Sequence, residues 1–187
     1  MIGCDDSGEE AGLKGSQDVA AHYARRGIPV MSMMQFDMVG WTDESTTMGV
    51  IRDFTDPTTT DFAVKLVDTY TSSFVNRVDS SCGYACSDHG SWMKHGYPAA
   101  FLFESDFKDR SPFIHTAKDT VENLRFDWMM EFTKIATGFA VELGHVADDN
   151  LLEPVMHHAS EQKQEPEEEQ QDEEDEEELS SLLRLDF

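Results

Sequence analysis

Short apolar runs alternate with helical patterns along the chain, and this alternation is what most constrains the fold. In chain order the predicted elements are a helix at 16–26, strands at 28–36 and 48–52, helices at 58–75 and through Lys94, a strand at 98–103 and a helix at 126–146. Strands that alternate with helices build a sheet covered on both faces. The pattern predicts an α/β fold, a three-layer αβα sandwich with a mixed β-sheet, over residues 9–148.

Two helix starts are predicted from capping residues. Thr59 or Thr60 is expected to cap the helix at 58–75, and Ser87 or Asp88 to cap the short helix that ends at Lys94. Hydroxyl and carboxylate side chains serve there because they accept hydrogen bonds from the free N–H groups of the first turn.

Net charge is −24, from 38 acidic and 14 basic residues, which makes nucleic acid an improbable partner. Residues 161–178 alone hold 12 Asp or Glu and one Lys, so 149–187 is predicted to be an acidic, mostly disordered tail. Neither a membrane-spanning run nor a signal peptide is visible, and residues 1–8 are too short and polar for a buried strand. We expect a monomer without a membrane partner.

The cysteines number three, which is odd. Cys82 and Cys86 are close enough to pair, which would leave Cys4 single. Their spacing is not the two-residue gap of zinc ribbons, so a structural metal is not predicted there.

Candidate catalytic residues begin with the adjacent Glu9 and Glu10, which lie between glycines. Neighbouring side chains on a turn point in different directions, so one carboxylate can bind a metal while the other acts as general base. Asp37 ends a predicted strand, where ligands gather in open α/β sheets, and His115 lies in a polar loop. Each has a plainer interpretation: a solvated acidic surface, a turn-capping Asp and a structural His.

Three motifs occur together in one order. They are E-E-A-G-L-x-G-S at 9–16, C-G-Y-A-C-S-D-H at 82–89 and I-H-T-x-x-D-T at 114–120. From about Gly8 to His145 the chain resembles the secreted leucyl-aminopeptidase branch of the dizinc exopeptidases, which has bacterial and fungal members. The resemblance implies a zinc aminopeptidase that removes leucine-like residues from peptides with free N-termini, in a secreted, extracellular or vacuolar setting.

The resemblance also assigns roles to individual residues. Glu9 matches the general acid/base, Glu10 and His115 match ligands of one zinc, and Asp37 matches a ligand of the other. It implies a disulfide between Cys82 and Cys86 beside the substrate pocket. The residues that would contact substrate are Tyr84, Met38, Ile51, Phe103, Phe107 and Ile114.

One part of the family pattern is missing from this sequence. The family takes a His and a metal-bridging Asp from a region well upstream of the glutamate pair, whereas here Glu9 is close to the first residue. We therefore expect an N-terminally truncated C-terminal part of such an enzyme, with one zinc or fewer where the family has two, and with impaired activity. The alternative is a non-catalytic interaction protein that carries an acidic tail on an aminopeptidase-like body.

Overall fold

The computed structural model of the chain describes residues 8–42 and 45–145. The chain divides into two compact units, Met1–Glu153 and Pro154–Phe187, and all the described residues belong to the first. Cys4, nearly all of the segment 1–8 and the predicted tail 149–187 lie outside the described residues. No helix among the described residues is long and apolar enough to cross a membrane.

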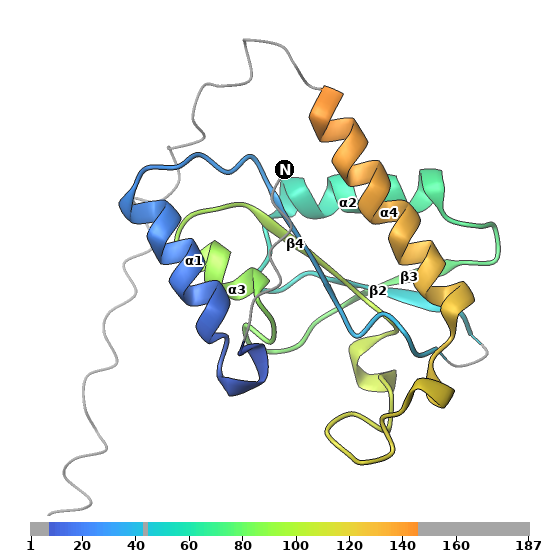
Figure 1. Cartoon of the computed structure of the whole chain (residues 1–187). Coiled ribbons are helices and arrows are strands. Elements are labelled where there is room, and N and C mark those ends of the chain that lie inside the picture. The colour runs from blue at the N-terminus through green and yellow to red at the C-terminus, as the bar shows by residue number, and fades with distance from the viewer. Residues whose placement is uncertain (1–7, 43–44, 146–187) are drawn as a thin grey trace, which may run out of the picture. The chain divides into compact units, whose positions relative to one another are not determined.

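The described residues form an alternating series of helices and strands (Figure 1). In chain order they are η1 (Glu9–Ala11), α1 (Lys14–Arg25), β1 (Met33–Asp37), β2 (Thr47–Ile51), α2 (Pro57–Tyr70), β3 (Asn76–Ser80), α3 (His89–Lys94), β4 (Ala99–Phe103), η2 (Phe107–Asp109), η3 (Val121–Asn123) and α4 (Phe126–His145). The predicted elements are all present, although the strand expected at 28–36 is confined to Met33–Asp37.

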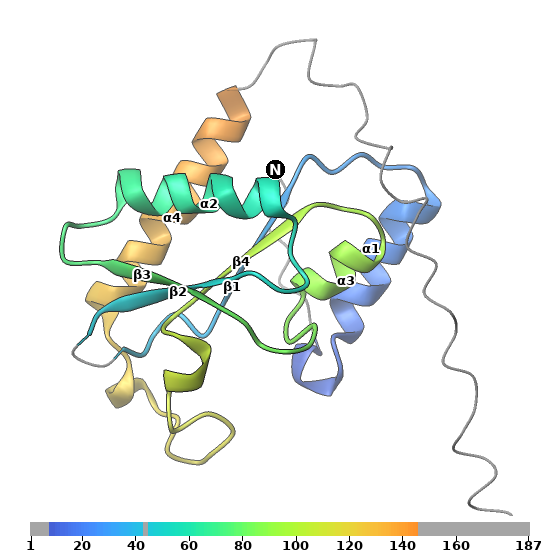
Figure 2. The ribbon, with the colours of Figure 1, turned by 180° about the vertical axis from the view of Figure 1, so that it is seen from behind.

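The four strands form one mixed sheet in the order β1-β4-β2-β3 (Figure 2). β4 runs parallel to β1, with Asp37 opposite Phe103, and antiparallel to β2. β2 and β3 are parallel to each other. The predicted mixed α/β sheet is confirmed.

β4 is the buried centre of the sheet, and its side chains alternate between the two faces. Ala100 and Leu102 belong to the core under α2 and α4, whereas Phe101 and Phe103 belong to a separate cluster on the opposite face. This is the period-two alternation of a strand with both faces covered. Such burial explains why the sequence of this strand is continuously apolar.

Each face of the sheet is covered by a pair of helices. On one face, Trp128 and Phe132 of α4 pack with α2 and the sheet. On the other, Trp92 of α3 packs with α1, and a buried hydrogen bond from the Ser16 hydroxyl to the Ser91 hydroxyl (2.8 Å) joins these two helices. The three-layer αβα sandwich is therefore confirmed.

Helix α2 begins and ends earlier than the sequence pattern indicated. Its N-cap is Asp56, whose carboxylate accepts a 2.7 Å hydrogen bond from the Thr59 N–H, and Pro57 takes the first helical position. The expected caps Thr59 and Thr60 lie inside the helix, because the Asp56 carboxylate already accepts the Thr59 N–H. The helix stops at Tyr70, which leaves room for β3.

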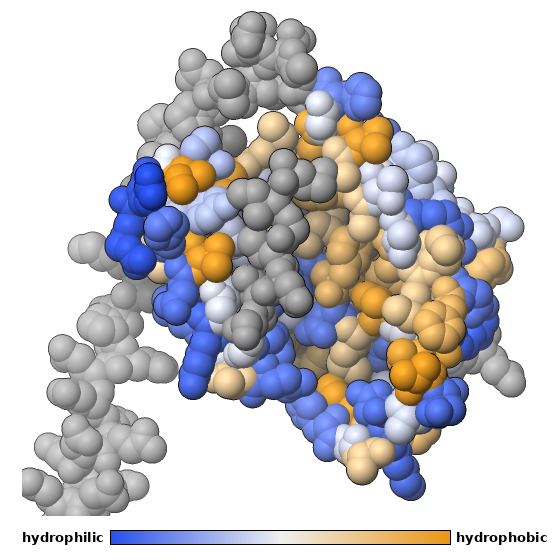
Figure 3. Space-filling view, viewed as in Figure 1, coloured by the Kyte–Doolittle hydropathy of each residue, from blue (hydrophilic) through white to orange (hydrophobic). Residues whose placement is uncertain are grey.

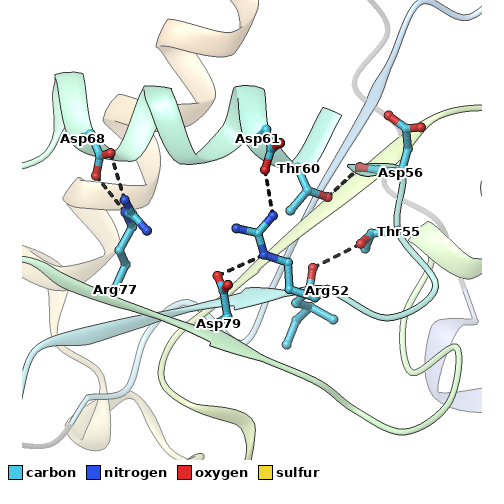
Figure 4. Close-up of polar contacts among 9 residues, drawn as sticks. Arg52, Thr55, Asp56, Thr60, Asp61, Asp68, Arg77 and Asp79 are labelled. Carbon is cyan, nitrogen blue, oxygen red and sulfur yellow. Dashed lines mark hydrogen bonds and ion pairs between the residues drawn. The ribbon is translucent and has the colours of Figure 1, made fainter. Parts of the chain in front are cut away.

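Strand β3 was not predicted. It is a polar edge strand, and its apolar content is a single Val78, so hydropathy alone does not mark it. Figure 4 shows how arginines tie this edge to α2: Arg52 bridges Asp61 and Asp79, both at 2.9 Å. These pairs are largely exposed, so each contributes at most about 1 kcal/mol.

Strand β1 forms the other edge of the sheet, and within the described residues it pairs only with β4. All five of its residues are half-buried. Figure 3 shows apolar side chains gathered over the region of β1 and α4. β1 therefore has the apolar character of an inner strand although it stands at an edge.

Gly49 of β2 lies beside the residues that follow β4. It pairs with Phe103, and a Cβ atom at this glycine would stand 2.1 Å from the carbonyl oxygen of Ser105. No side chain fits that space, so glycine is required for the chain after β4 to pass close to β2.

The most deeply buried ionisable ring is His89 at the start of α3. It has no exposed surface, stacks against Phe101 at 4.9 Å, and neither ring nitrogen has a hydrogen-bond partner. Burial lowers its pKa to about 4. The sequence matched this residue to no ligand position, and its burial is that of a structural residue.

We predict that His89 makes the fold acid-sensitive. A histidine whose pKa is lower folded than unfolded adds stability that is complete above the unfolded value of 6.5 and is lost as the pH falls to about 4. Relative to His89→Phe, the wild type should lose about 3 kcal/mol of unfolding free energy across that window. Chemical denaturation at several pH values measures it, with exposed His22→Gln as control. Parallel profiles for wild type and His89→Phe would refute the prediction.

Candidate active site

Parallel pairing of β1 and β4 brings two loops to one edge of the sheet. Asp37 is the last residue of β1, and Glu104 follows the last residue of β4. Opposing positions in a parallel pair end together, so the loops that leave these strands begin side by side. The loop after β4 is the one that carries His115.

The Glu9–Glu10 pair lies on a single tight turn, η1. Gly8 and Gly12 flank it with φ of 83° and 92°, the left-handed region that suits glycine. The Gly8 carbonyl accepts hydrogen bonds from the N–H groups of Ala11 and Lys14. The glycines of the motif therefore fold the backbone around the two carboxylates and lead directly into α1.

Four other ionisable groups act on the carboxyl of Glu9. Its pKa is raised, first by burial and then by the negative charges of Asp37, Glu10 and Asp88, while His115 lowers it. Charges act on a pKa in this way only from nearby, so these four groups lie in the neighbourhood of Glu9. The structure thus brings together the predicted general base and the three predicted metal ligands. It adds Asp88, which the sequence reasoning considered only as a helix cap.

Glu10 and His115 contact each other directly. The Glu10 Oε2 and His115 Nε2 atoms are 3.0 Å apart, and both side chains are mostly exposed. His115 has φ of 58°, an uncommon value for a residue other than glycine and one that recurs at functional sites. The contact orients the Nε2 atom of the imidazole toward the Glu10 carboxylate.

The Glu10–His115 pair is compatible with a zinc ion. Two donors on a tetrahedral zinc, each about 2.1 Å from the metal, stand about 3.4 Å apart. The observed 3.0 Å separation is close to that spacing, and carboxylate oxygen and imidazole nitrogen are ordinary zinc donors. In residues 8–42 and 45–145, however, no three His, Cys, Asp or Glu side chains converge as a metal-holding group. Glu10 and His115 could thus contribute two donors to a zinc ion.

A short hydrogen-bond chain fixes the carboxylate of Asp37. The Gln35 amide donates to the Ser87 hydroxyl (3.0 Å), which donates to Asp37 Oδ2 (2.7 Å). Gln35 and Asp37 lie two residues apart on one face of β1, so a single hydroxyl can contact both. Ser87 is buried. Sequence reasoning missed this role; the signal available was the polar Gln35 inside an apolar strand.

Most of the predicted apolar pocket residues belong to one cluster beside this site. Ile51 and Phe103 are almost completely buried, with 0% and 2% exposure, while Met38 and Phe107 are half-buried and pack against them. Ile114 is also half-buried. Ile51 and Phe103 therefore lie behind the surface that Met38 and Phe107 present.

The predicted disulfide is present between Cys82 and Cys86, whose Cα atoms are 6.1 Å apart. Both cysteines pack against the same apolar cluster. Asp53 anchors the loop by accepting hydrogen bonds from the N–H groups of Cys82 (3.1 Å) and Gly83 (2.6 Å). Within this loop Tyr84 is 60% exposed, so its phenol is accessible to a bound molecule.

The protein family follows from a comparison with known sequences. Residues 6–140, well over half of the chain, match peptidase family M28. The chain therefore belongs to peptidase family M28. It is 45% identical over 143 residues to leucine aminopeptidase 1 of Sclerotinia sclerotiorum, an alignment that covers 73% of this chain and 36% of that protein.

Solved structures agree with this family. The LapA aminopeptidase of Legionella pneumophila is 43% identical, with a TM-score of 0.68 over 72% of this chain and 36% of that one. A zinc aminopeptidase of Bacillus subtilis, at 19% identity and a TM-score of 0.57, shares the fold. The chain spans little more than a third of the length of the relatives that it matches.

We predict that Ser87 and Gln35 are coupled energetically in the hydrogen-bond chain to Asp37. Ser87→Ala leaves the Gln35 amide and one oxygen of Asp37 without their partner, so it should lower the unfolding free energy by roughly 1–3 kcal/mol. Denaturant unfolding of Ser87→Ala, Gln35→Ala and the double variant forms a double-mutant cycle. The double variant should lose less unfolding free energy than the sum of the losses in the two single variants. Strict additivity would show that the hydrogen-bond chain carries no coupling.

Proposed function

We propose that this chain forms part of a zinc-dependent aminopeptidase that removes leucine-like residues from the N-termini of peptides. The observation that supports it best is the contact of Glu10 with His115 beside Glu9, a carboxyl on which the charges of Glu10, Asp37 and His115 all act. The leucine aminopeptidase activity named for a relative at 45% identity points the same way.

Zinc would be held by Glu10 and His115, with Asp37 available for a second ion. A bound zinc lowers the pKa of its water and polarises the peptide carbonyl. Glu9 takes the general-base role: its carboxylate accepts the proton of the attacking water and donates it to the departing amine. The raised pKa of Glu9 suits this role, because a base that must also release the proton works best near the operating pH.

The preference for an apolar first residue would come from the cluster beside the disulfide. Met38 and Phe107 of this cluster present half-buried apolar surface, and so does Ile114 in the loop after β4. Tyr84 provides an exposed phenol in the disulfide loop. An apolar side chain gains about 25 cal/mol for each Å² of surface removed from water there. The disulfide suits an oxidising compartment, which favours a secreted or vacuolar setting.

A protein of these 187 residues is proposed to work poorly as a monomeric enzyme. Catalytic zinc usually has three protein ligands, and the described residues supply two to one ion. We therefore expect weak binding of at most about one zinc per chain.

We predict that zinc binding depends on His115. Removing one of two protein donors should weaken the affinity by at least about tenfold. Competition with a chromogenic chelator on dialysed protein measures this for wild type and His115→Ala, with His145→Ala as a matched control on α4. Equal affinity in the wild type and His115→Ala would contradict the proposed site.

Activity is the second readout, and it uses a second pair of variants. Any hydrolysis of leucine p-nitroanilide should be lost in Glu9→Gln, which keeps the shape of the side chain but cannot accept the proton. Glu142→Gln, an exposed change on α4, should have no effect. Two zinc ions per chain would contradict the expected impairment while leaving the proposed reaction in place.

A further inference from the structure

Glu104 is a buried carboxylate to which neither the sequence reasoning nor the proposed mechanism gives a role. It follows β4 directly and is 2% exposed. Its Oε2 accepts a hydrogen bond from the Trp41 N–H (2.8 Å), and its Oε1 accepts one from the Ser111 N–H (3.2 Å). Trp41 lies in the loop after β1 and Ser111 in the loop after β4. One side chain therefore binds both loops that leave this edge of the sheet.

The main chain of Glu104 strengthens the same connection. Its N–H donates to the carbonyl of Met38 (3.0 Å), the residue that follows Asp37. Its carbonyl accepts the indole N–H of Trp128 on α4 (3.2 Å). Met38 has φ of 50°, an uncommon conformation for this residue type that must be held by its surroundings. Glu104 thus helps to set how the backbone turns after Asp37.

A second series of hydrogen bonds leads from Glu104 to the turn that contains His115. The Ser111 hydroxyl accepts from the Phe113 N–H (3.2 Å), and the Phe113 carbonyl accepts from both the N–H and the hydroxyl of Thr116. Phe113 and Thr116 are joined across the turn that encloses His115. These hydrogen bonds connect the buried Glu104 carboxylate to the turn of His115, whose backbone conformation is uncommon for histidine.

We propose that Glu104 is a positioning residue for the candidate active site. By binding Trp41 and Ser111 at once, it fixes the end of β1, which carries Asp37, relative to the turn that carries His115. The zinc part of this inference rests on the proposed function, whereas the positional part does not.

A buried carboxylate can also be purely structural, and the chain offers such a case for comparison. Glu131 of α4 is 4% exposed and accepts hydrogen bonds from the N–H and the hydroxyl of Ser72. It forms an ion pair with Lys134 at 2.6 Å, and its partner Ser72 follows the end of α2. The Glu104 carboxylate, by contrast, accepts hydrogen bonds from backbone N–H groups of two loops, those of Trp41 and Ser111. Both carboxylates stabilise the fold, but only Glu104 contacts segments that contain site residues.

The experiment compares Glu104→Gln with Glu131→Gln at pH 8, where the Glu104 carboxyl, whose pKa burial raises to about 7, is largely ionised. Gln keeps the shape but offers one acceptor oxygen in place of two. Glu104→Gln should speed amide exchange at Trp41 or Ser111 by roughly tenfold. It should also shift the His115 ring signal in the NMR spectrum of the zinc-free protein. Glu131→Gln should change exchange at Ser72 and leave His115 in place.

Ser111→Ala is the second variant, for use if Glu104→Gln does not fold. It removes the acceptor of the Phe113 N–H without touching Glu104. The His115 signal should again move, while exchange at Trp41 stays as in the wild type. The hydrogen bond from the Arg125 N–H to the Gly40 carbonyl (2.7 Å) remains in both variants and keeps the two loops attached.

Zinc affinity then separates the two claims. If the wild type binds zinc, Glu104→Gln should weaken binding by roughly 10- to 100-fold, the effect typical of outer residues that orient ligands. Zinc affinity unchanged in Glu104→Gln, or a His115 signal that stays in place, would overturn the positioning role. A wild type that binds no zinc would count against the proposed function alone, and the His115 signal would then decide the inference.

Discussion

The structure depends above all on the parallel pairing of β1 with β4. Their register places Asp37 opposite Phe103, so the loops after both strands begin at one edge of the sheet. Because β4 is buried on both faces, its position is set by packing from α2, α3 and the neighbouring strands. The site thus lies beside a strand that is buried along its whole length, and hydrogen bonds of Glu104 and Ser87 hold Ser111 and Asp37 in place there.

The electrostatics of the site favour a cation. The negative charges of Asp37, Glu10 and Asp88 act on Glu9, Asp37 also acts on Asp88, and the charge of His115 offsets them at Glu9. Like charges held together raise one another's pKa and oppose folding. A metal ion would relieve this repulsion, since carboxylates and imidazole are donors that zinc accepts. The same arrangement explains why the Glu9 carboxyl is suited to handle protons.

The sequence was informative wherever function and local conformation share a motif. Glycines on either side of the Glu9–Glu10 pair define both the turn and the chemistry, and the i,i+4 cysteine pair formed the predicted disulfide. The three-layer sandwich could likewise be predicted, because β4 and α4 have strong hydrophobic patterns. These features depend on residues close together in the chain.

What could not be predicted depends on contacts between distant segments. β3 is polar because it is an edge strand, so its hydropathy resembles that of a loop. Asp56, and not a threonine, caps α2 because its carboxylate accepts the hydrogen bond from the Thr59 N–H. Ser87 contacts Asp37, 50 positions away, and Glu104 contacts Ser111, 7 positions away. Neither separation is part of a sequence motif that indicates a function.

Gly49 has a consequence for how this protein can change over generations. Its missing side chain leaves room for the carbonyl of Ser105, the residue next to Glu104, so any larger residue would push that segment outward. A substitution there would disturb the site from behind, without touching a peptide or a metal. In a mutational library, Gly49 should therefore tolerate as little variation as the acidic residues of the site. A natural substitution of Gly49 would be expected only together with a changed backbone path for the residues that follow β4.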